Sequence, residues 1–310
     1  MEKYKNPLHT SSFDYFIRPI IECKSPPRLN ITVRYADVVY EPPNDKLRVG
    51  LFQEIYFIDD DLLDPKALIA LPFPYALRIL TRSIPKFKLR ALTPKQLWVS
   101  TTYLAKKYSD INPIVLRPIA SKILLIKAKK HTALDPRICY HGTWSHKNEI
   151  KWLIPVIREV QSRCPDTIFE IIGGDKVAKL FKGIPRVEVL DTMPWPQYLE
   201  HTSNVHQDIG LAPLMDTLFN RGRGPIKFFD YARAGAVGIY SKGPAFGDFV
   251  TDGVDGFLLD NDPQLWVEKI VELVNNPELR QVMADKAWEK VLDNSPASQS
   301  VQDYLNGFQT

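Results

Sequence analysis

The chain has 310 residues, about twice the usual length of one domain, so we expect two α/β-sized lobes. Its 45% hydrophobic and 25% charged residues exclude a disordered, collagen-like or coiled-coil protein. Three scattered cysteines without a C-x-x-C spacing disfavour a disulfide scaffold and a cysteine-built zinc site, and they fit a reducing compartment.

The net charge of +4 hides an asymmetry between the two halves of the chain. Residues 1–134 carry 22 Lys/Arg and 12 Asp/Glu, whereas residues 135–310 carry 18 and 24. Within 65–134 there are 14 basic residues and a single acid, Asp110. We expect this region to attract a phospholipid surface or a pyrophosphate-linked lipid, or alternatively only to keep the lobe soluble. Nucleic acid is not expected, because no interleaved aromatic platform or Cys/His finger accompanies the basic residues.

The first half is predicted to consist of short strands and Pro-rich connections. The apolar stretch 67–80 contains two prolines and Arg78, so it is too short and too broken to span a bilayer. The opening segment lacks the apolar core of a signal peptide, and a soluble cytoplasmic protein is expected. Strands are predicted at 29–40, 47–58, 111–119 and 122–126, and a strand entering a helix at 95–110. The acidic run 57–64 is interpreted as a helix start rather than a metal motif.

We place the domain boundary in the linker-like segment 128–137, where the sign of the charge changes. This predicts two consecutive domains, 1–130 and 131–310. Strands and helices alternate in the second half, which indicates a doubly wound parallel sheet. Its predicted strands are 137–141, 167–174, 186–191, 208–214, 236–241 and 257–260; its predicted helices are 149–163, 175–181, 195–202, 226–235, 263–275 and 277–293, followed by a polar tail.

Two loops at predicted strand ends carry candidate chemistry, because ligands bind beyond the carboxyl ends of such strands. In HGTWSHKNE (141–149), Gly142 permits close ligand approach, Thr143 offers a hydroxyl, and His146 and Lys147 supply donors at a helix start, which together suit a phosphate. The alternative is a plain turn in which Ser145 or Asn148 caps the helix.

The second loop is FNRGRGPIKFFD (219–230), which contains two glycines, Gly222 and Gly224, and two basic candidates, Arg223 and Lys227. Backbone N–H groups freed by the glycines, together with a helix start, could hold a diphosphate. Asp230, one turn beyond Lys227, could accept hydrogen bonds from two neighbouring hydroxyls of a ribose or sugar. The alternative is a local i,i+3 ion pair between these two residues.

Other chemistries are disfavoured. The pairs His141/His146 and His201/His206 are spaced by five residues, which does not align two zinc ligands on one helix face. We find no G-x-S-x-G elbow, no P-loop and no complete G-x-G-x-x-G motif in the sequence.

The second half, from about Arg137 to Val291, resembles the donor-binding lobe of GT-B glycosyltransferases of the group 1, family 4-like type. Four pieces occur in the family's order: G-T-x-x-H-x-x-E from Gly142, LAPL at 211–214, the segment 219–241, and FVTDGVDGFLL at 249–259. The segment 219–241 resembles the family's F-N-x-x-K-S-x-x-K-x-x-E-Y-x-A-x-G-x-P. The segment 98–119 is similar to the last strand–helix–strand of the family's first lobe.

The resemblance implies a GT-B fold of two Rossmann-like doubly wound domains facing a cleft, with the N-terminal domain shortened. It implies that Asp230 contacts the ribose, that Arg223 and Lys227 lie near the donor pyrophosphate, and that Gly142 faces the phosphates. His146 or Lys147 would supply the basic group of the first loop. The other implied donor contacts are Thr143, Met193, Pro194, Asn220, Gly222 and Gly224, with Met193 and Pro194 near the nucleobase.

The activity implied is transfer of a sugar from a nucleotide-sugar donor to an acceptor hydroxyl, with retention and without a metal or other cofactor. Arg223 and Lys227 would stabilise the leaving diphosphate, and His146 would contact sugar or phosphate. The expected acceptor is a saccharide or a lipid-linked acceptor, as in surface polysaccharide or glycolipid synthesis, with possible association at the inner face of the membrane. The alternatives are a nucleotide-sugar-binding protein without turnover, with Gly222 in place of the family's first acidic residue, and a GT-B-fold epimerase or phosphorylase.

Overall fold

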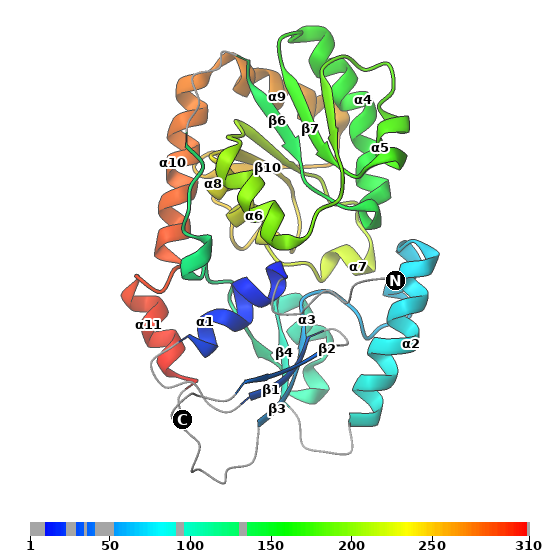
Figure 1. Cartoon of the computed structure of the whole chain (residues 1–310), viewed down its shortest axis with the longest axis vertical. Coiled ribbons are helices and arrows are strands. Elements are labelled where there is room, and N and C mark those ends of the chain that lie inside the picture. The colour runs from blue at the N-terminus through cyan, green and yellow to red at the C-terminus, as the bar shows by residue number, and fades with distance from the viewer. Residues whose placement is uncertain are drawn as a thin grey trace. The chain divides into compact units, whose positions relative to one another are not determined.

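The computed structural model describes residues 10–22, 29–33, 36–40, 53–90, 96–129 and 135–308. The chain forms two compact units (Figure 1). Unit 1 comprises Met1–Leu124, Thr217–Ile226 and Leu292–Thr310, and unit 2 comprises Leu125–Asp216 and Lys227–Val291. No helix among the described residues has the length and apolar character needed to cross a bilayer.

Unit 1 is built on a five-stranded sheet of order β2-β1-β3-β4-β5. The strands are β1 Leu29–Val33, β2 Ala36–Tyr40, β3 Gln53–Ile58, β4 Gln96–Val99 and β5 Ile114–Val115. All neighbours pair in parallel except β1 and β2, which pair antiparallel with Ile31 opposite Val38. The single strand expected at 29–40 is therefore two strands that fold back on one another. The first part of the strand expected at 47–58 lies outside the described residues.

The helical elements of unit 1 come from three separate parts of the chain. They are η2 Phe13–Ile17, α1 Arg18–Ile21, η3 Ala67–Ala70, α2 Phe73–Arg90, α3 Thr102–Lys107, η4 Ser109–Ile111, η5 Lys122–Leu124, α7 Leu218–Arg221 and α11 Gln299–Asn306. The strand expected at 122–126 is wrong, because Leu124 N donates to Ser121 O and closes a 3₁₀ turn. The expected polar tail contains the helix α11, whose Val301 and Leu305 are buried.

The acidic run 57–64 does not start a helix at its first three aspartates. Asp59, Asp60 and Asp61 lie in the loop after β3 and are buried. Asp61 accepts hydrogen bonds from Lys107 Nζ at 2.6 Å and from the Tyr108 hydroxyl at 2.5 Å. The carboxylate of Asp61 is thus held by an ion pair inside unit 1 rather than by a helix dipole.

Unit 2 is built on a six-stranded, fully parallel sheet of order β11-β10-β9-β6-β7-β8. The strands are β6 Arg137–Tyr140, β7 Ile168–Ile172, β8 Val187–Leu190, β9 Ile209–Ala212, β10 Val237–Ser241 and β11 Gly256–Leu259. Numbered from the first strand of the unit, this is the order 3-2-1-4-5-6 of a doubly wound Rossmann sheet. The doubly wound parallel sheet predicted for the second half is confirmed.

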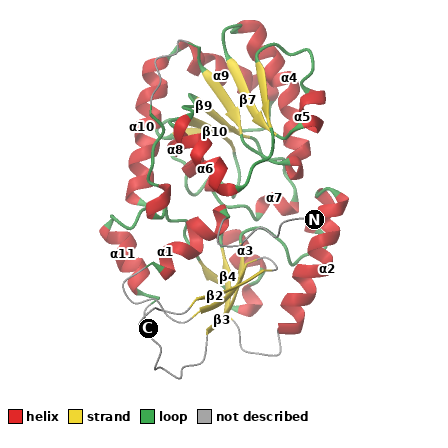
Figure 2. Cartoon of the chain, in the orientation of Figure 1, coloured by secondary structure: helices red, strands yellow, loops and turns green. Residues whose placement is uncertain are grey.

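Helices join these strands as crossovers, which is what parallel pairing requires (Figure 2). They are η6 Trp144–His146, α4 Lys147–Arg163, α5 Asp175–Leu180, α6 Trp195–Asn204 and α8 Ile226–Ala234. Two further helices, α9 Pro263–Asn275 and α10 Pro277–Asp293, follow the last strand, β11. Apolar residues spaced along one side of α4, such as Ile150, Leu153 and Ile157, are completely buried. Trp152 of α4 packs edge-on against Trp266 of α9, with ring centroids 5.1 Å apart.

Unit 1 contains two segments from the second half of the chain. The two units therefore differ from the expected consecutive domains 1–130 and 131–310. Thr217–Ile226 and Leu292–Thr310 both belong to unit 1 although they follow the expected boundary. The physical reason lies in their packing: Ala120 N donates to Asn294 O at 2.8 Å, and Trp98 packs against Phe308. Residues 130–134, where the boundary was placed, lie outside the described residues.

Candidate functional site in unit 2

The strand order of unit 2 reverses direction between β6 and β9. The chain leaves β6 toward β7 on one side and leaves β9 toward β10 on the other. The loops that follow these two strands therefore diverge, and a crevice at such a switch point is where ligands bind in open α/β sheets. The expected phosphate loop begins at His141, directly after β6, so it lies at this point of the fold.

The loop after β6 approaches a tyrosine ring closely. A Cβ atom at Gly142 would lie 2.7 Å from the ring of Tyr140, so a side chain at this position would require the buried ring to shift. Thr143 is exposed, and its Oγ1 shares a hydrogen bond with Ser145 Oγ at 2.9 Å. Lys147 is the first residue of α4, and no side chain caps either η6 or α4. The alternative interpretation, in which Ser145 or Asn148 caps the helix, is therefore wrong.

The helix that follows the loop after β6, α4, also makes a hydrogen bond to the chain that follows β9. His146 is buried, and its Nδ1 lies 4.0 Å from Glu149 Oε2 on the first turn of α4. The other oxygen of Glu149, Oε1, accepts a hydrogen bond from the backbone N–H of Met215 at 3.2 Å. Glu149 thus links the chain segments that follow the two strands of the switch point.

Lys227, in the second candidate segment (219–230), contacts the first candidate loop (141–149). Its ammonium group, on the first turn of α8, donates to the backbone carbonyl of His141. The same ammonium lies 4.9 Å from the centroid of the Tyr140 ring and 5.6 Å from that of Tyr231. These ring faces favour the charged form of the lysine. The structure therefore places a positive charge at the carboxyl end of β6, beside Gly142.

Asp230 lies one turn further along α8 and is 8% exposed. Burial is the main cause that raises the pKa of Tyr198, and the negative charge of Asp230 raises it further. The hydroxyl of Tyr198 is in turn hydrogen-bonded to His141, the residue that precedes Gly142. Lys227 thus connects α8 to the end of β6, and Asp230 acts on Tyr198 through its charge.

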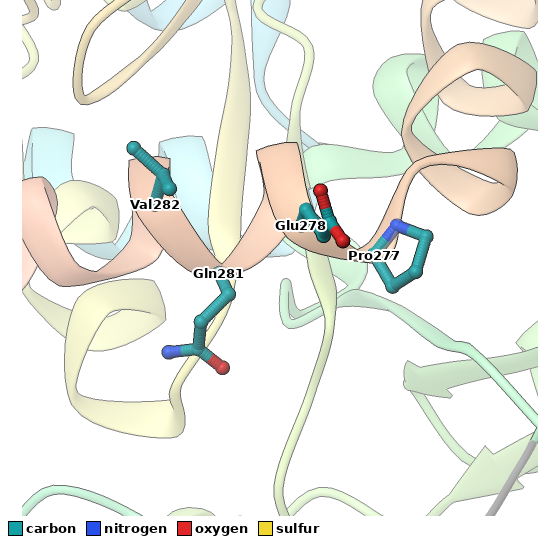
Figure 3. Close-up of a pocket in the computed structure, with 4 residues that line it drawn as sticks. All are labelled: Pro277, Glu278, Gln281 and Val282. Atoms are coloured by element: carbon teal, nitrogen blue, oxygen red, sulfur yellow. The ribbon is translucent and has the colours of Figure 1, made fainter.

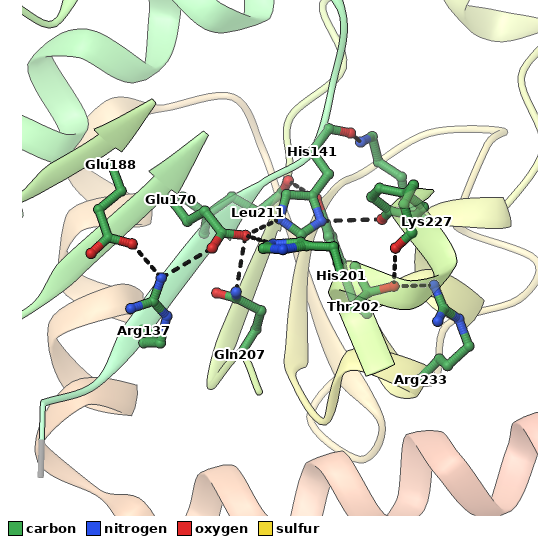
Figure 4. A network of polar contacts seen from close by, with 12 residues as sticks. Arg137, His141, Glu170, Glu188, His201, Thr202, Gln207, Leu211, Lys227 and Arg233 are labelled. Carbon is green, nitrogen blue, oxygen red and sulfur yellow. Dashed lines mark hydrogen bonds and ion pairs between the residues drawn. The ribbon is translucent and has the colours of Figure 1, made fainter. Parts of the chain in front are cut away.

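A buried carboxylate anchors the side chain of His141 (Figure 4). Glu170, in the middle of β7, is 1% exposed, and its Oε1 lies 2.8 Å from His141 Nε2 and 2.9 Å from His201 Nε2. The same oxygen accepts from Gln207 Nε2 at 3.0 Å, and Oε2 accepts from Arg137 at 3.0 Å. Four donors from three segments of unit 2 therefore converge on one carboxylate.

The protonation states in this network follow from burial and charge. Burial would raise the pKa of Glu170, but hydrogen bonds from His141 and His201 outweigh burial and hold this pKa well below its usual range. Burial lowers the pKa of His141, and the charge of Lys227 adds to this effect. A neutral His141 that donates from Nε2 to Glu170 must accept at Nδ1, where the Tyr198 hydroxyl lies at 3.1 Å.

Among the described residues, one group of side chains has an arrangement that could hold a metal ion, namely His141, Glu170 and His201. Ligand atoms of His141, Glu170 and His201 lie within 4.8 Å of one another, and the set of two histidines and a glutamate is one that binds zinc. The contacts with Glu170 have hydrogen-bond lengths, and Oε1 already receives three donors. Hydrogen bonding accounts for the cluster. The fold brings His141 and His201 together, although neither of the pairs His141/His146 and His201/His206 aligns on one helix face.

Four of the predicted site residues fall in unit 1: Asn220, Gly222, Arg223 and Gly224. Arg223 Nε donates to Asn220 Oδ1 at 3.1 Å and lies 3.9 Å from Asp60 Oδ1. The backbone N–H of Gly222 donates to Phe219 O at 3.2 Å. This differs from the expectation of freed amides, because the Thr217 hydroxyl caps α7 and winds the chain into a helical turn.

Of the two glycines in this segment, Gly222 has a packing role. Gly222 has a φ of −81°, which any residue can adopt. A Cβ there would lie 3.1 Å from both Asp61 N and Leu104 Cδ2, whereas a Cβ at Gly224 would make only ordinary contacts at 3.7 Å or more. Close packing thus explains Gly222, and nothing in the surroundings of Gly224 demands a glycine.

Met193 and Pro194 lie between β8 and α6, at the same edge of the sheet as the loop after β6. Pro194 is exposed and stands at the N-cap position of α6. Trp195 follows it and stacks on Tyr198, which reaches His141. The structure thus connects this segment to the network through Tyr198.

A hollow lies on the first turns of α10, lined by Pro277, Glu278, Gln281 and Val282 (Figure 3). Of these four residues, only Glu278 is charged, and its charge is negative. A diphosphate would be repelled there, so this hollow does not compete with the switch point as a phosphate site.

Glu170, Tyr198 and His201 were missed by reasoning from the sequence. The available signal was Glu170 itself, a charged residue in the middle of an otherwise apolar predicted strand, because a buried carboxylate needs partners. The identity of the partners could not be read from the sequence, since they come from β6, α6 and the segment before β9.

Residues 135–276 match the family model described as Glycosyl transferases group 1. A comparison with curated protein sequences finds no match.

Several solved structures share the fold. TarM of S. aureus has a TM-score of 0.59 and 17% identity over 84% of this chain, which spans 51% of TarM. WaaG, a glycosyltransferase involved in lipopolysaccharide biosynthesis, has a TM-score of 0.59 and 14% identity over 82% of this chain and 74% of WaaG. The pneumococcal O-GlcNAc transferase GtfA, solved with UDP and GlcNAc, has a TM-score of 0.56 and 12% identity over 83% of this chain and 52% of GtfA.

The chain thus spans about half the length of TarM and of GtfA. Residues 135–276 are thus similar to the glycosyl transferases group 1 family, and the chain has the GT-B fold of these solved structures.

Proposed function

We propose that the protein is a glycosyltransferase that moves a sugar from a nucleotide-sugar donor to an acceptor hydroxyl. The observation that carries this proposal is the position of the Lys227 ammonium on the His141 carbonyl, beside Gly142, at the switch point of a domain similar to the group 1 family. A nucleotide sugar carries its negative charge on the diphosphate, and a fixed cation at such a crevice favours that group.

In this proposal Lys227 acts mainly in the transition state. Cleavage of the bond between sugar and diphosphate builds negative charge on the leaving oxygen. A lysine whose ammonium is already held by a carbonyl and two rings stabilises that charge without a further loss of side-chain freedom. Asp230 positions the ribose, and His146 contacts sugar or phosphate. For Arg223 the support is the family pattern, since its described contacts lie in unit 1. Transfer with retention and without a metal is part of the proposal and rests on the resemblance.

The proposed donor is a UDP-sugar in the first instance, because the GtfA structure holds UDP and GlcNAc and that of HepE from Anabaena holds UDP and glucose. The proposed acceptor is a saccharide or a lipid-linked saccharide of a surface polysaccharide or glycolipid. This is supported by WaaG, which is described as acting in lipopolysaccharide biosynthesis. We propose a cytoplasmic location at the membrane, which the buried thiols Cys139 and Cys164, both unpaired, support.

The test is release of nucleotide from UDP-, GDP-, CMP- and dTDP-sugars by the full chain, with and without saccharide acceptors and with a chelator. Release that requires an acceptor and persists with the chelator is the expected result. Tight binding of a nucleotide sugar with no release under any condition would show a binding protein without turnover. Formation of a free epimer without acceptor, or dependence on inorganic phosphate, would show an epimerase or a phosphorylase.

A further inference from the structure

The chain that follows strand β9 is fixed by side chains from three separate elements of unit 2. The backbone N–H of Leu214 donates to Ser241 Oγ, at the end of β10, at 2.8 Å. The backbone carbonyl of Leu214 accepts from Asn261 Nδ2, just after β11, at 2.7 Å. The backbone N–H of Met215 donates to Glu149 Oε1, in the first turn of α4, at 3.2 Å. We call the side chains of Glu149, Ser241 and Asn261 the clamp.

The clamp replaces packing at the point where burial ends. All of β9 is buried, whereas Leu214 and Met215 are half-buried and Asp216 is exposed. Ser241 is 3% exposed, and its hydroxyl accepts from Leu214 and donates to Asn261 Oδ1, so two members of the clamp also hold each other. The position of this short segment is therefore set by hydrogen bonds to side chains rather than by a surrounding core.

Glu149 is the member of the clamp whose presence near a phosphate site needs an explanation. Its carboxylate is 4% exposed and lies in the first turn of the helix that follows the predicted phosphate loop. A negative charge close to a diphosphate repels it, so phosphate binding by itself does not favour a glutamate here. The helix dipole stabilises a carboxylate at this position, but an exposed carboxylate would be stabilised in the same way. The inward orientation of Glu149 adds a bond from the helix after β6 to the chain after β9.

We propose that Leu214–Met215 forms one wall of the pocket for the donor sugar, and that Glu149 is the positioning residue that sets this wall. The inference rests on the proposed function, in which the diphosphate lies beside Gly142 at the end of β6. The sugar is bonded directly to that diphosphate, so it lies in the same crevice, whose second side follows β9. Three backbone polar groups of the segment are engaged by the clamp, so the segment offers mainly apolar side chains, which suit the C–H face of a sugar ring.

A fixed wall matters for transfer more than for nucleotide binding. Transfer requires the reacting carbon of the sugar to be held in line with the acceptor, and a displacement of about 1 Å can cost about 10²-fold in rate. The nucleotide itself is held by its diphosphate, which the proposed function assigns to Lys227. Loosening the clamp should therefore lower the rate of transfer and leave the affinity for free UDP almost unchanged.

Two substitutions of Glu149 separate its hydrogen bond from its charge. The side-chain oxygen of Glu149→Gln can still accept from the Met215 N–H, whereas Glu149→Ala removes the bond. Hydrogen–deuterium exchange of the full chain should show the Met215 amide exchanging at least about tenfold faster in Glu149→Ala and at the wild-type rate in Glu149→Gln.

Kinetics with a nucleotide sugar and its acceptor provide the functional measurement. We expect kcat/KM to fall at least about tenfold in Glu149→Ala, with the affinity for UDP within about threefold of the wild type, and Glu149→Gln to restore transfer. Glu159→Ala, at an exposed position of the same helix, is the matched control and should behave as the wild type.

Asn261→Ala removes a second bond of the clamp from an exposed residue, so it provides a test even if Glu149→Ala does not fold. It should lower kcat/KM by at least about threefold, and thermal melting shows which variants are folded. Wild-type transfer in Asn261→Ala and in a folded Glu149→Ala, or equal losses in the alanine and glutamine variants of Glu149, would overturn the proposal alone. Absence of transfer by the wild type would overturn the proposed function and this proposal with it.

Discussion

The carboxylate of Glu170 shows how a residue outside the predicted site can shape that site. Arg137, His141, His201 and Gln207 all donate to it, which offsets the desolvation of a charge buried in β7. The bond to His141 orients the imidazole, and the backbone carbonyl of that same residue receives Lys227. Glu170 therefore acts on the candidate phosphate site through His141, as a positioning residue.

The first prediction concerns stability at mildly acidic pH. The pKa of His141 is lowered in the folded chain, so the unfolded chain binds more protons just below the ordinary histidine pKa. The resulting stability is complete above about pH 6.5 and declines as the pH falls below it, by at most about 1.4 kcal/mol per pH unit.

His141→Gln keeps a neutral donor toward Glu170 and removes the titrating ring. We expect the free energy of unfolding to depend less steeply on pH between 7 and 5.5 in this variant than in the wild type. Denaturant unfolding at a series of pH values measures both slopes. Identical slopes would show that His141 does not titrate as its burial requires.

At the scale of single residues, the sequence identifies candidate site residues only where they belong to a local motif. Gly142 and Lys227 occur in loops after apolar runs, and the structure brings these two loops together through the His141 carbonyl. The engagement of Arg223 with Asn220 and Asp60 was not predicted, because Asp60 lies far away in the sequence. Contacts between distant residues depend on the tertiary fold, which periodicity and spacing do not report.

The elements of unit 2 were predicted better than those of unit 1. In unit 2 each strand is a mainly apolar run bounded by turn residues, and the predicted helices 263–275 and 277–293 match α9 and α10. In unit 1 the segment 29–40 alternates without a glycine or proline to show where β1 ends and β2 begins. The apolar run 122–126 is too short to distinguish a strand from a 3₁₀ turn by its pattern.

A second prediction concerns the end of α8. Gly235 has a φ of +87°, and a Cβ there would lie 2.3 Å from the ring of His206. Gly183 has a similar φ of +84°, but a Cβ there would meet no atom within 4 Å. Gly183→Ala should therefore cost about 1 kcal/mol of stability from backbone strain alone, and Gly235→Ala clearly more.

Urea unfolding of the two alanine variants measures the difference. Because the backbone strain is matched, the excess loss in Gly235→Ala reports the clash with His206. Equal losses in the two variants would contradict the packing seen at the end of α8.

At the scale of the whole molecule, the chain passes between the units several times. Unit 1 collects a first segment, the short piece Thr217–Ile226 and the last segment from Leu292. Composition shows the change of charge near residue 130. It cannot show that these two later segments belong to unit 1, because that depends on which surfaces pack together. The C-terminal segment packs on Trp98, a 1% exposed residue of the first segment.

A third prediction tests this return of the chain. Phe308 packs edge-on against Trp98 with ring centroids 5.4 Å apart. Phe308→Ala should destabilise unit 1 by about 2 kcal/mol, less than the loss of a fully buried ring, whereas Val282→Ala at an exposed position should change stability by less than about 0.5 kcal/mol. Tryptophan fluorescence during urea unfolding measures both. A loss no larger in Phe308→Ala than in Val282→Ala would contradict the assignment of the C-terminal segment to unit 1.

The central claim is that Lys227 holds a donor diphosphate at the switch point of unit 2, and titration calorimetry with UDP, GDP, CDP and dTDP tests it most directly. We predict that the wild type binds at least one of these and that Lys227→Met weakens that affinity by at least about tenfold, the effect of losing one charge-assisted hydrogen bond. Lys182→Met, at an exposed position of unit 2, should bind as the wild type does. The claim would be contradicted if the wild type bound none of the four nucleotides, or if a folded Lys227→Met variant bound them with undiminished affinity.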